Sequence, residues 1–202
     1  MSKTSKPPNE KLLDYINIYL DSVRSNHAAG DELEVRFGTK FWNPTTQIDF
    51  NNVISKLKSQ EFNADVSEGS YRLTIMNQYI DRRSGGMKIS NIRTEVAGIG
   101  AIQDYCKSNS FDTESIPRNI TFNQKRSKHW KGEFLKAIDF DDFQFRVNYK
   151  EEKYLRPNFG LVQGMLSKWE ASRKIFRFIK RFSFAHPKFP FTIDCSIVQT
   201  SS

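Results

Sequence analysis

The sequence contains seven short segments in which apolar and polar residues alternate, or in which β-branched and aromatic residues are concentrated. Both patterns are typical of β-strands, whose side chains point alternately to the two faces of a sheet. The segments are 31–37, 71–80, 87–96, 119–126, 143–152, 175–184 and 191–198. Residues 81–86 have the composition of a hairpin loop between the second and the third segment. So many strands with few helices predict an α+β fold with an antiparallel sheet that is curved or closed.

Three other segments have the apolar spacing of amphipathic helices: Asn9 to Ser25, Asp49 to Gln60 and Ile102 to Ser108. The first eight residues lack this pattern, so we expect a flexible tail over 1–8 and a single domain over 9–202. No apolar run approaches the roughly 20 residues of a membrane span, and the polar start of the chain is unlike a signal peptide. We therefore expect an intracellular protein without membrane contact.

The positive charge of the chain is concentrated in one stretch. The 202 residues carry a net charge of +8. Residues 118–182 contain 16 Lys and Arg against 7 Asp and Glu, so this stretch alone carries +9 and the rest of the chain −1. A basic surface favours a polyanionic partner such as nucleic acid or phosphate. A solvated basic surface without such a partner is the alternative that composition leaves open.

The segment 31–37 carries different chemistry on its two faces. Its apolar face, which we expect to point to the core, consists of Leu33, Val35 and Phe37. Its other face is fully charged and consists of Glu32, Glu34 and Arg36. Two glutamates at this spacing on a strand lie roughly 7 Å apart, close enough to share a hard cation or its waters. Mg²⁺ and Mn²⁺ prefer such oxygen ligands.

Later strands carry basic side chains on their polar faces. In 143–152, Arg146 and Lys150 lie opposite the apolar face of Phe145, Val147 and Tyr149, and in 175–184 Arg177 and Arg181 share a face. In 191–198, Thr192, Asp194 and Ser196 alternate with apolar residues. Carboxylates for a metal, together with guanidinium and ammonium groups for phosphate oxygens, indicate a metal-assisted phosphoryl hydrolase.

Four pieces of the sequence resemble a known family when taken in order. They are Glu32-Leu-Glu-Val-Arg-Phe-Gly38, the pair 92–96 and 102–106, Phe176 to Phe184, and Phe191 to Val198. The first piece resembles the first tunnel strand of the triphosphate tunnel metalloenzymes. Within that family the chain is most similar to the RNA triphosphatase domain of large DNA virus mRNA capping enzymes. The resemblance covers most of the chain from Asp31 onward.

The resemblance implies an antiparallel eight-stranded β-tunnel with short flanking helices and a lumen lined by charged side chains. By this resemblance Glu32 and Glu34 are ligands of Mg²⁺ or Mn²⁺, and Asp194 is a carboxylate that orients a metal-bound water. The implied phosphate contacts are Arg36, Arg93, Lys125, Arg146, Arg177 and Arg181, with Lys150 and Lys180 as weaker candidates. Lys180 has the wrong strand parity unless a bulge shifts it.

The implied activity is metal-dependent hydrolysis of the γ-phosphate of RNA 5′-triphosphate ends, the first step of mRNA capping. Implied partners are triphosphate-ended RNA and the guanylyltransferase and methyltransferase domains of a longer capping enzyme. A viral protein of this kind acts in the host cytoplasm or the virion. The family carries a second Glu-x-Glu on a late strand, which is absent after Asp194, and the adjacent Glu151 and Glu152 cannot present both carboxylates to one face. We therefore expect a tunnel without its last strand, as a fragment or with a partner that supplies it.

Two other functions stay open at this stage. The first is a non-catalytic basic β module that binds RNA through residues 118–182, with Trp130 and Tyr154 stacking on bases. The second keeps the tunnel fold but acts on inorganic polyphosphate, thiamine triphosphate or nucleoside triphosphates. Metal dependence and the relative rates on these substrates separate the three.

Overall fold

The computed structural model describes residues 6–25, 30–38, 45–65, 70–111, 118–141 and 144–201. The chain forms two compact units, each built from two stretches of sequence. Unit 1 comprises Met1–Thr46 and Lys125–Lys153, and unit 2 comprises Gln47–Gln124 and Tyr154–Ser202. The chain passes between them three times: between Thr46 and Gln47, and inside two continuous strands, β5 (Ile120–Ser127) and β9 (Phe145–Leu155).

All seven segments predicted as strands are strands, and the fold is α+β as expected. Hydrogen bonds connect them in the order β1-β9-β5-β4-β3-β10-β11, and every pairing with a described register is antiparallel. The other long strands are β1 (Asp31–Phe37), β3 (Ser70–Ile80), β4 (Met87–Ala97), β10 (Lys174–His186) and β11 (Phe189–Ser201). Short strands are β2 (Asn63–Ala64), which pairs with β10, β8 (Ile138–Phe140), which pairs with β9, and the separate pair β6 (His129–Trp130) and β7 (Glu133–Phe134).

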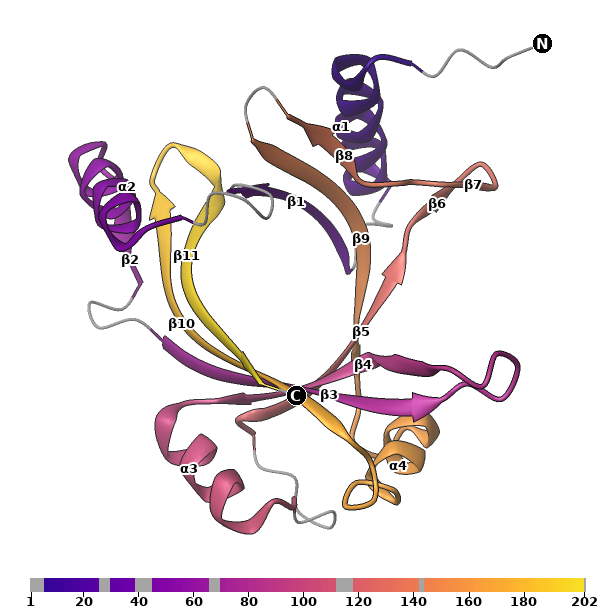
Figure 1. The fold of residues 1–202 in the computed structure, drawn as a ribbon. Coiled ribbons are helices and arrows are strands. Elements are labelled where there is room, and N and C mark those ends of the chain that lie inside the picture. Colours follow the sequence, from indigo (N-terminus) through magenta and orange to yellow (C-terminus); the bar gives the residue numbers. More distant parts are fainter. Residues whose placement is uncertain are drawn as a thin grey trace. The chain divides into compact units, whose positions relative to one another are not determined.

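Helix α1 (Pro8–Arg24) covers one face of the strands of unit 1, and it lies beside β8 in Figure 1. The helix begins at Pro8, so this residue belongs to the helix and not to the predicted tail; residues 1–5 lie outside the described part of the chain. Proline suits a first helical position because the amide hydrogen that it lacks has no intrahelical partner there. The core of unit 1 consists of Tyr15, Ile18, Leu135, Ile138, Phe140, Val147 and Tyr149.

The apolar face predicted for β1 is only partly correct. Leu33 packs against the core of unit 1, but Val35 is 45% exposed and Phe37 is 80% exposed. Phe37 contacts the ring of Phe145 on the neighbouring strand at a centroid distance of 5.7 Å, at the end of the pairing between β1 and β9. Alternation therefore predicted the side of the strand correctly but not how far the core extends along it.

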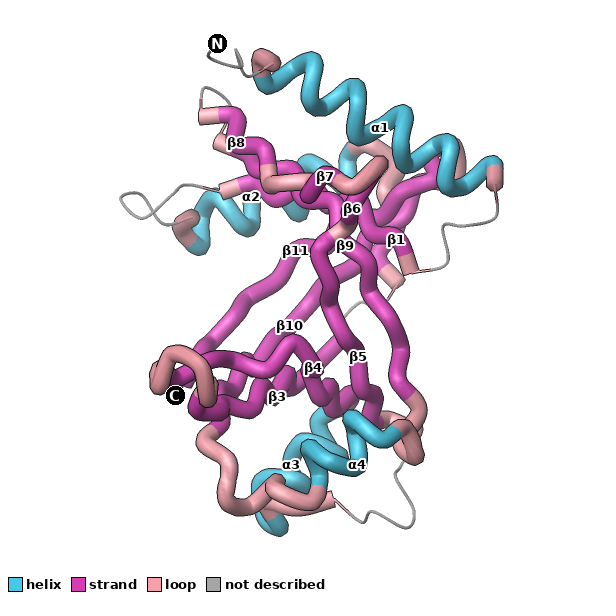
Figure 2. The backbone as a smooth tube through the Cα atoms, turned by 90° about the vertical axis from the view of Figure 1, so that its right-hand side faces the viewer, coloured by secondary structure: helices cyan, strands magenta, loops and turns pink. Residues whose placement is uncertain are grey.

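Helices α3 (Ile99–Ser108) and α4 (Gly160–Leu166) pack on one face of the sheet in unit 2, and Figure 2 shows both on the same side of β3, β4 and β5. The core between these helices and the sheet consists of Leu73, Ile75, Ile92, Val96, Ile102, Tyr105, Ile120, Phe122, Leu155, Val162, Leu166 and Trp169. Because the helices cover this face, the side chains of opposite parity form the polar face of the same strands.

Helix α2 (Gln47–Ser59) matches its prediction in part. Its apolar spacing predicts a buried stripe of Phe50, Val53, Ile54 and Leu57. Phe50, Ile54 and Leu57 are half-buried, but no residue of the helix is fully buried and Val53 is 47% exposed. Phe50 contacts the ring of Phe182 on β10 at 6.2 Å. Among the described residues, no helix is long and apolar enough to cross a membrane.

Candidate active site

Strands β1 and β9 of unit 1 present a continuous row of polar side chains on one face. The register places Glu32 opposite Lys150, Glu34 opposite Asn148, and Arg36 opposite Arg146. Residues directly opposite each other in an antiparallel pair point to the same face. Three residues of the predicted site on β1 and two on β9 therefore share one surface.

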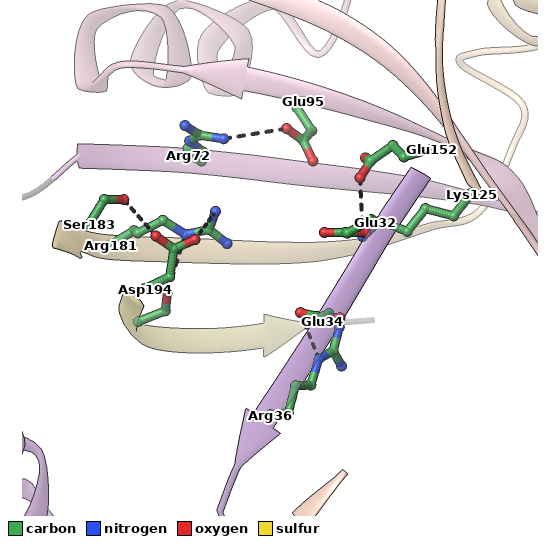
Figure 3. Close-up of polar contacts among 11 residues, drawn as sticks. Glu32, Glu34, Arg36, Arg72, Glu95, Lys125, Glu152, Arg181, Ser183 and Asp194 are labelled. Atoms are coloured by element: carbon green, nitrogen blue, oxygen red, sulfur yellow. Dashed lines mark hydrogen bonds and ion pairs between the residues drawn. The ribbon is translucent and has the colours of Figure 1, made fainter. Parts of the chain in front are cut away.

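A lysine from β5 joins two carboxylates on this surface (Figure 3). The Lys125 Nζ atom lies 2.8 Å from Glu32 Oε2 and 3.3 Å from Glu152 Oε2. All three side chains are partly buried, with exposed fractions of 21% for Lys125, 36% for Glu32 and 27% for Glu152. Water screens such ion pairs less than fully exposed ones, so the two carboxylates form an effective binding site for a positive charge.

Glu152 was missed by the sequence reasoning. Because the adjacent Glu151 and Glu152 cannot share a face, the sequence does not predict a pair of carboxylates here, but Glu152 alone adds one carboxylate to the charged face. Glu152 follows Arg146, Asn148 and Lys150 at the strand period of two, so alternation alone places it on the charged face of β9.

The remaining cations of this face are also engaged. Arg36 Nε lies 2.9 Å from Glu34 Oε1. Arg146 donates two hydrogen bonds to Asp139 on β8, at 2.6 and 3.0 Å. These hydrogen bonds raise the pKa of Arg146 above the usual value of an arginine. The Lys150 ammonium lies 5.6 Å from the centre of the Phe134 ring. The surface is thus a network of paired charges, in which Lys125 is the cation shared by two glutamates.

A buried ion pair anchors the beginning of β1. The Asp31 side chain is 1% exposed and accepts hydrogen bonds from Lys128 Nζ at 2.7 and 2.8 Å and from the Tyr149 hydroxyl at 2.8 Å. Burial raises the pKa of Tyr149 to about 12, and Asp31 acts in the same direction while the contact with Ser22 opposes it. The hydroxyl therefore keeps its proton at neutral pH and stays a donor. Through these contacts Asp31 fixes the start of β1, directly before Glu32.

The polar face of unit 2 centres on β10 and β11. Asp194 accepts a hydrogen bond from the Ser183 hydroxyl at 2.7 Å, and its other oxygen lies 2.9 Å from Arg181 Nη1. Arg181 Nε also donates to the Ser196 hydroxyl at 3.3 Å. Figure 3 shows Arg181 and Ser183 directed at Asp194. These contacts hold the Arg181 side chain by two of its nitrogens.

Further charged residues share this face of unit 2. Arg72 lies 3.9 Å from Glu95, a pair that the sequence reasoning did not single out. The register places Glu95 opposite Thr74 and Arg93 opposite Met76 on β3, while Thr74 is also opposite Arg177 on β10. Arg93 and Arg177 therefore have the same parity as Arg181, as the predicted site requires.

Lys180 lies on the other face of β10. Its ammonium is 5.4 Å from the ring centre of Tyr71 and 5.3 Å from that of Phe182. The register of β10 with β11 shifts only between Ala185 and His186, so no bulge moves Lys180 to the face of Arg177 and Arg181. This candidate phosphate contact is not part of the polar face.

Three glutamates of unit 1, Glu32, Glu34 and Glu152, have the oxygen ligands that a hard divalent metal ion requires. Within the described ranges no group of three or more His, Cys, Asp or Glu is arranged to hold a metal ion. Mg²⁺, however, is commonly bound by one or two carboxylates with waters and substrate phosphates completing its shell. Glu32 and Glu152 already converge on a cation, and Glu34 is on the same face. This donor set fits Mg²⁺ or Mn²⁺ bound together with a phosphate ligand.

Comparisons with known proteins give a match in structure only. No family model matches the chain, and no curated protein matches it in sequence. Two crystal structures of the triphosphatase of the Mimivirus capping enzyme are similar to it, both at 15% sequence identity. The match to the monoclinic crystal form covers 93% of this chain and 80% of the Mimivirus chain, with a TM-score of 0.55. The match to the triclinic form covers 92% of this chain and 80% of the Mimivirus chain, with a TM-score of 0.52. The chain has the fold of this triphosphatase. The activity has to be argued from the side chains.

Proposed function

We propose that the chain hydrolyses the γ-phosphate of RNA 5′-triphosphate ends in a reaction that depends on a divalent metal. The observation that carries the proposal is the pairing of Glu32 and Glu152 around one cation, on a strand face that also holds Glu34, in a chain with the fold of a capping enzyme triphosphatase. Mg²⁺ or Mn²⁺ would be held by Glu32 and Glu34, with Glu152 beside them.

The bound metal would polarise a phosphate oxygen and offset negative charge in the transition state. The protein side chains bind and orient the triphosphate. Guanidinium groups offer paired donors that match phosphate oxygens, whereas an ammonium acts as a point charge. The proposed phosphate ligands are Arg36, Arg93, Lys125, Arg146, Lys150, Arg177 and Arg181.

Asp194 is proposed to position Arg181. Both of its oxygens are engaged, one with Arg181 and one with Ser183. A carboxylate held in this way fixes the direction of the guanidinium before substrate arrives, which lowers the entropy cost of binding phosphate. The water-orienting role implied by the family resemblance stays an alternative for this residue.

In the proposed reaction water attacks the γ-phosphorus in line with the leaving oxygen. The bond between the γ-phosphorus and the β,γ-bridging oxygen breaks, inorganic phosphate leaves, and a diphosphate remains on the RNA. The water proton passes to solvent or to phosphate. A diphosphate end is the acceptor for a guanylyl group, so guanylyltransferase and methyltransferase activities would act on the product. The proposed setting is viral mRNA synthesis in the host cytoplasm or in the virion.

Release of phosphate from γ-labelled RNA tests the proposal directly. Glu32→Ala and Glu34→Ala should each reduce release by more than about a hundredfold in the presence of Mg²⁺ or Mn²⁺, because a charge that stabilises the transition state is removed. Glu133→Ala is the matched control, since Glu133 is an exposed glutamate of unit 1 on β7. Release by either site variant at the rate of the control would refute the proposal.

The same assay separates the alternatives. Rates on triphosphate-ended RNA, a nucleoside triphosphate and tripolyphosphate give the substrate preference. We expect RNA to be hydrolysed fastest; a faster rate on tripolyphosphate would assign the site to a polyphosphate hydrolase instead. Salt-sensitive RNA binding that ignores the 5′ end, without phosphate release, would assign a binding module.

A further inference from the structure

The glutamates proposed as metal ligands are paired with cations of the protein itself. Glu32 is paired with Lys125 at 2.8 Å and Glu34 with Arg36 at 2.9 Å, while Glu152 shares Lys125 at 3.3 Å. Three carboxylates and two cations leave this group with a charge of only −1. A divalent ion that binds here alone therefore meets charges that are already largely neutralised.

We infer that Lys125 is an exchangeable counter-ion that couples metal binding to triphosphate binding. In the structure its ammonium lies between Glu32 and Glu152. When metal and triphosphate bind together, the two carboxylates bind the metal and Lys125 moves to a phosphate oxygen. This inference rests on the proposed function and deepens it.

The charge balance and the nature of a lysine side chain support the exchange. Metal alone must displace Lys125 without offering it a new partner, and triphosphate alone must attract Lys125 away from two carboxylates. Bound together, each ligand removes the obstacle to the other, so their affinities rise in concert and by the same factor. The Lys125 side chain is 21% exposed, and an ammonium on a flexible four-carbon stem can change partners without a fixed geometry.

Lys128, three residues after Lys125, forms an ion pair that is too buried to exchange easily. Its partner Asp31 is only 1% exposed and is also bound by the Tyr149 hydroxyl. Breaking this pair would leave a buried carboxylate short of a charge partner, which is strongly unfavourable. The partners of Lys125 are 36% and 27% exposed, so water, metal or another cation can reach them. The two lysines therefore differ in whether their ion pairs can exchange.

Calorimetric titration of the full chain tests the inference with Mn²⁺ alone, with a non-hydrolysable β,γ-imido nucleoside triphosphate alone, and with the complex of the two. The stability of that complex in the same buffer is measured separately and subtracted. In the wild type we expect weak binding of Mn²⁺ alone and a coupling of about tenfold or more between the two ligands. Lys125→Gln should bind Mn²⁺ alone about tenfold more tightly and lose most of the coupling.

Two further variants control for structure and for net charge. Lys125→Arg keeps the positive charge and should bind Mn²⁺ alone as weakly as the wild type. Lys153→Gln removes a charge one residue from Glu152, from an exposed side chain of opposite parity on β9, and should change Mn²⁺ affinity by less than about twofold. An equal gain in all three variants would overturn the inference, because the effect would then come from net charge or altered packing.

Failure of this inference can be told apart from failure of the proposed function. If Glu32→Gln removes Mn²⁺ binding but Lys125→Gln does not strengthen it, the metal site stands and the exchange is refuted. If neither Glu32→Gln nor Glu34→Gln alters Mn²⁺ affinity, the metal site itself is refuted and the exchange with it.

Discussion

The charged faces of the two units are built in opposite ways. In unit 1 a cation, Lys125, lies between two carboxylates, Glu32 and Glu152. In unit 2 a carboxylate, Asp194, lies between a cation and a hydroxyl, Arg181 and Ser183. In the first arrangement another cation can replace the lysine, whereas in the second both carboxylate oxygens are occupied and the arginine is held in a fixed direction. The comparison supports the proposal that carboxylates of unit 1 hold the metal and that Arg181 of unit 2 is one of the phosphate ligands.

Two ion pairs of unit 1 differ strongly in burial. The Asp31 side chain, paired with Lys128, is 1% exposed, whereas Lys6 and its partner Asp14 on α1 are 59% and 47% exposed. Asp31→Asn should lower the free energy of unfolding by about 3 kcal/mol, because Lys128 is left without its charge partner. Urea denaturation measures this change.

Asp14→Asn provides the control for that variant. It removes an exposed carboxylate of the same unit, and the expected loss is below about 1 kcal/mol because water screens the pair. Equal losses in the two variants would show that Asp31 contributes no more than a surface charge. The beginning of β1, and with it Glu32, would then be held by the strand pairing alone.

The role of Asp194 in unit 2 sharpens the comparison further. Asp194→Asn should lower kcat/KM for triphosphate-ended RNA by about tenfold, mainly through a higher KM, because Arg181 loses the charge that directs it. Asp81→Asn is the control in unit 2. Asp81 is a hairpin aspartate whose pKa is lowered first by its hydrogen bond with Lys88 and then by Ser84. It follows the end of β3 opposite to Ser70, the residue that pairs with Arg181. A fall in kcat with KM unchanged would instead support a role in orienting the attacking water.

Strand alternation accounts for most of what the sequence could predict. Positions 32, 34 and 36 share a charged face, and Arg177 and Arg181 share another, because the period of two depends only on backbone geometry. The extent of the core depended on tertiary packing instead. Phe37 is apolar but lies at the end of the pairing between β1 and β9, where its ring contacts Phe145 and it is 80% exposed.

Two features could not be predicted from residue patterns: helix α4, and the contacts that the predicted site residues make with other strands. The seven residues of α4 include Gly160 and Gly164, which weaken the helical pattern, and the helix is held by burying Val162 and Leu166. The contact between Lys125 and Glu152 joins residues from different strands, so it depends on strand order and register. The sequence was enough to predict the face of β9 on which Glu152 lies, but not its contact with Lys125.

The variant with the smallest expected effect tests whether the face of β10 on which a basic residue lies determines whether it binds phosphate. Lys180 is adjacent to Arg181 but lies over the rings of Tyr71 and Phe182 on the opposite face. Lys180→Gln should therefore change kcat/KM for triphosphate-ended RNA by less than about twofold, while Arg181→Gln should lower it by tenfold or more. Both variants remove one positive charge from neighbouring positions, so a general loss of attraction for RNA would affect them equally. Equal losses would mean that net charge, and not the face of β10, determines binding. A loss confined to Arg181→Gln would place the phosphate ligands on the face that carries Asp194.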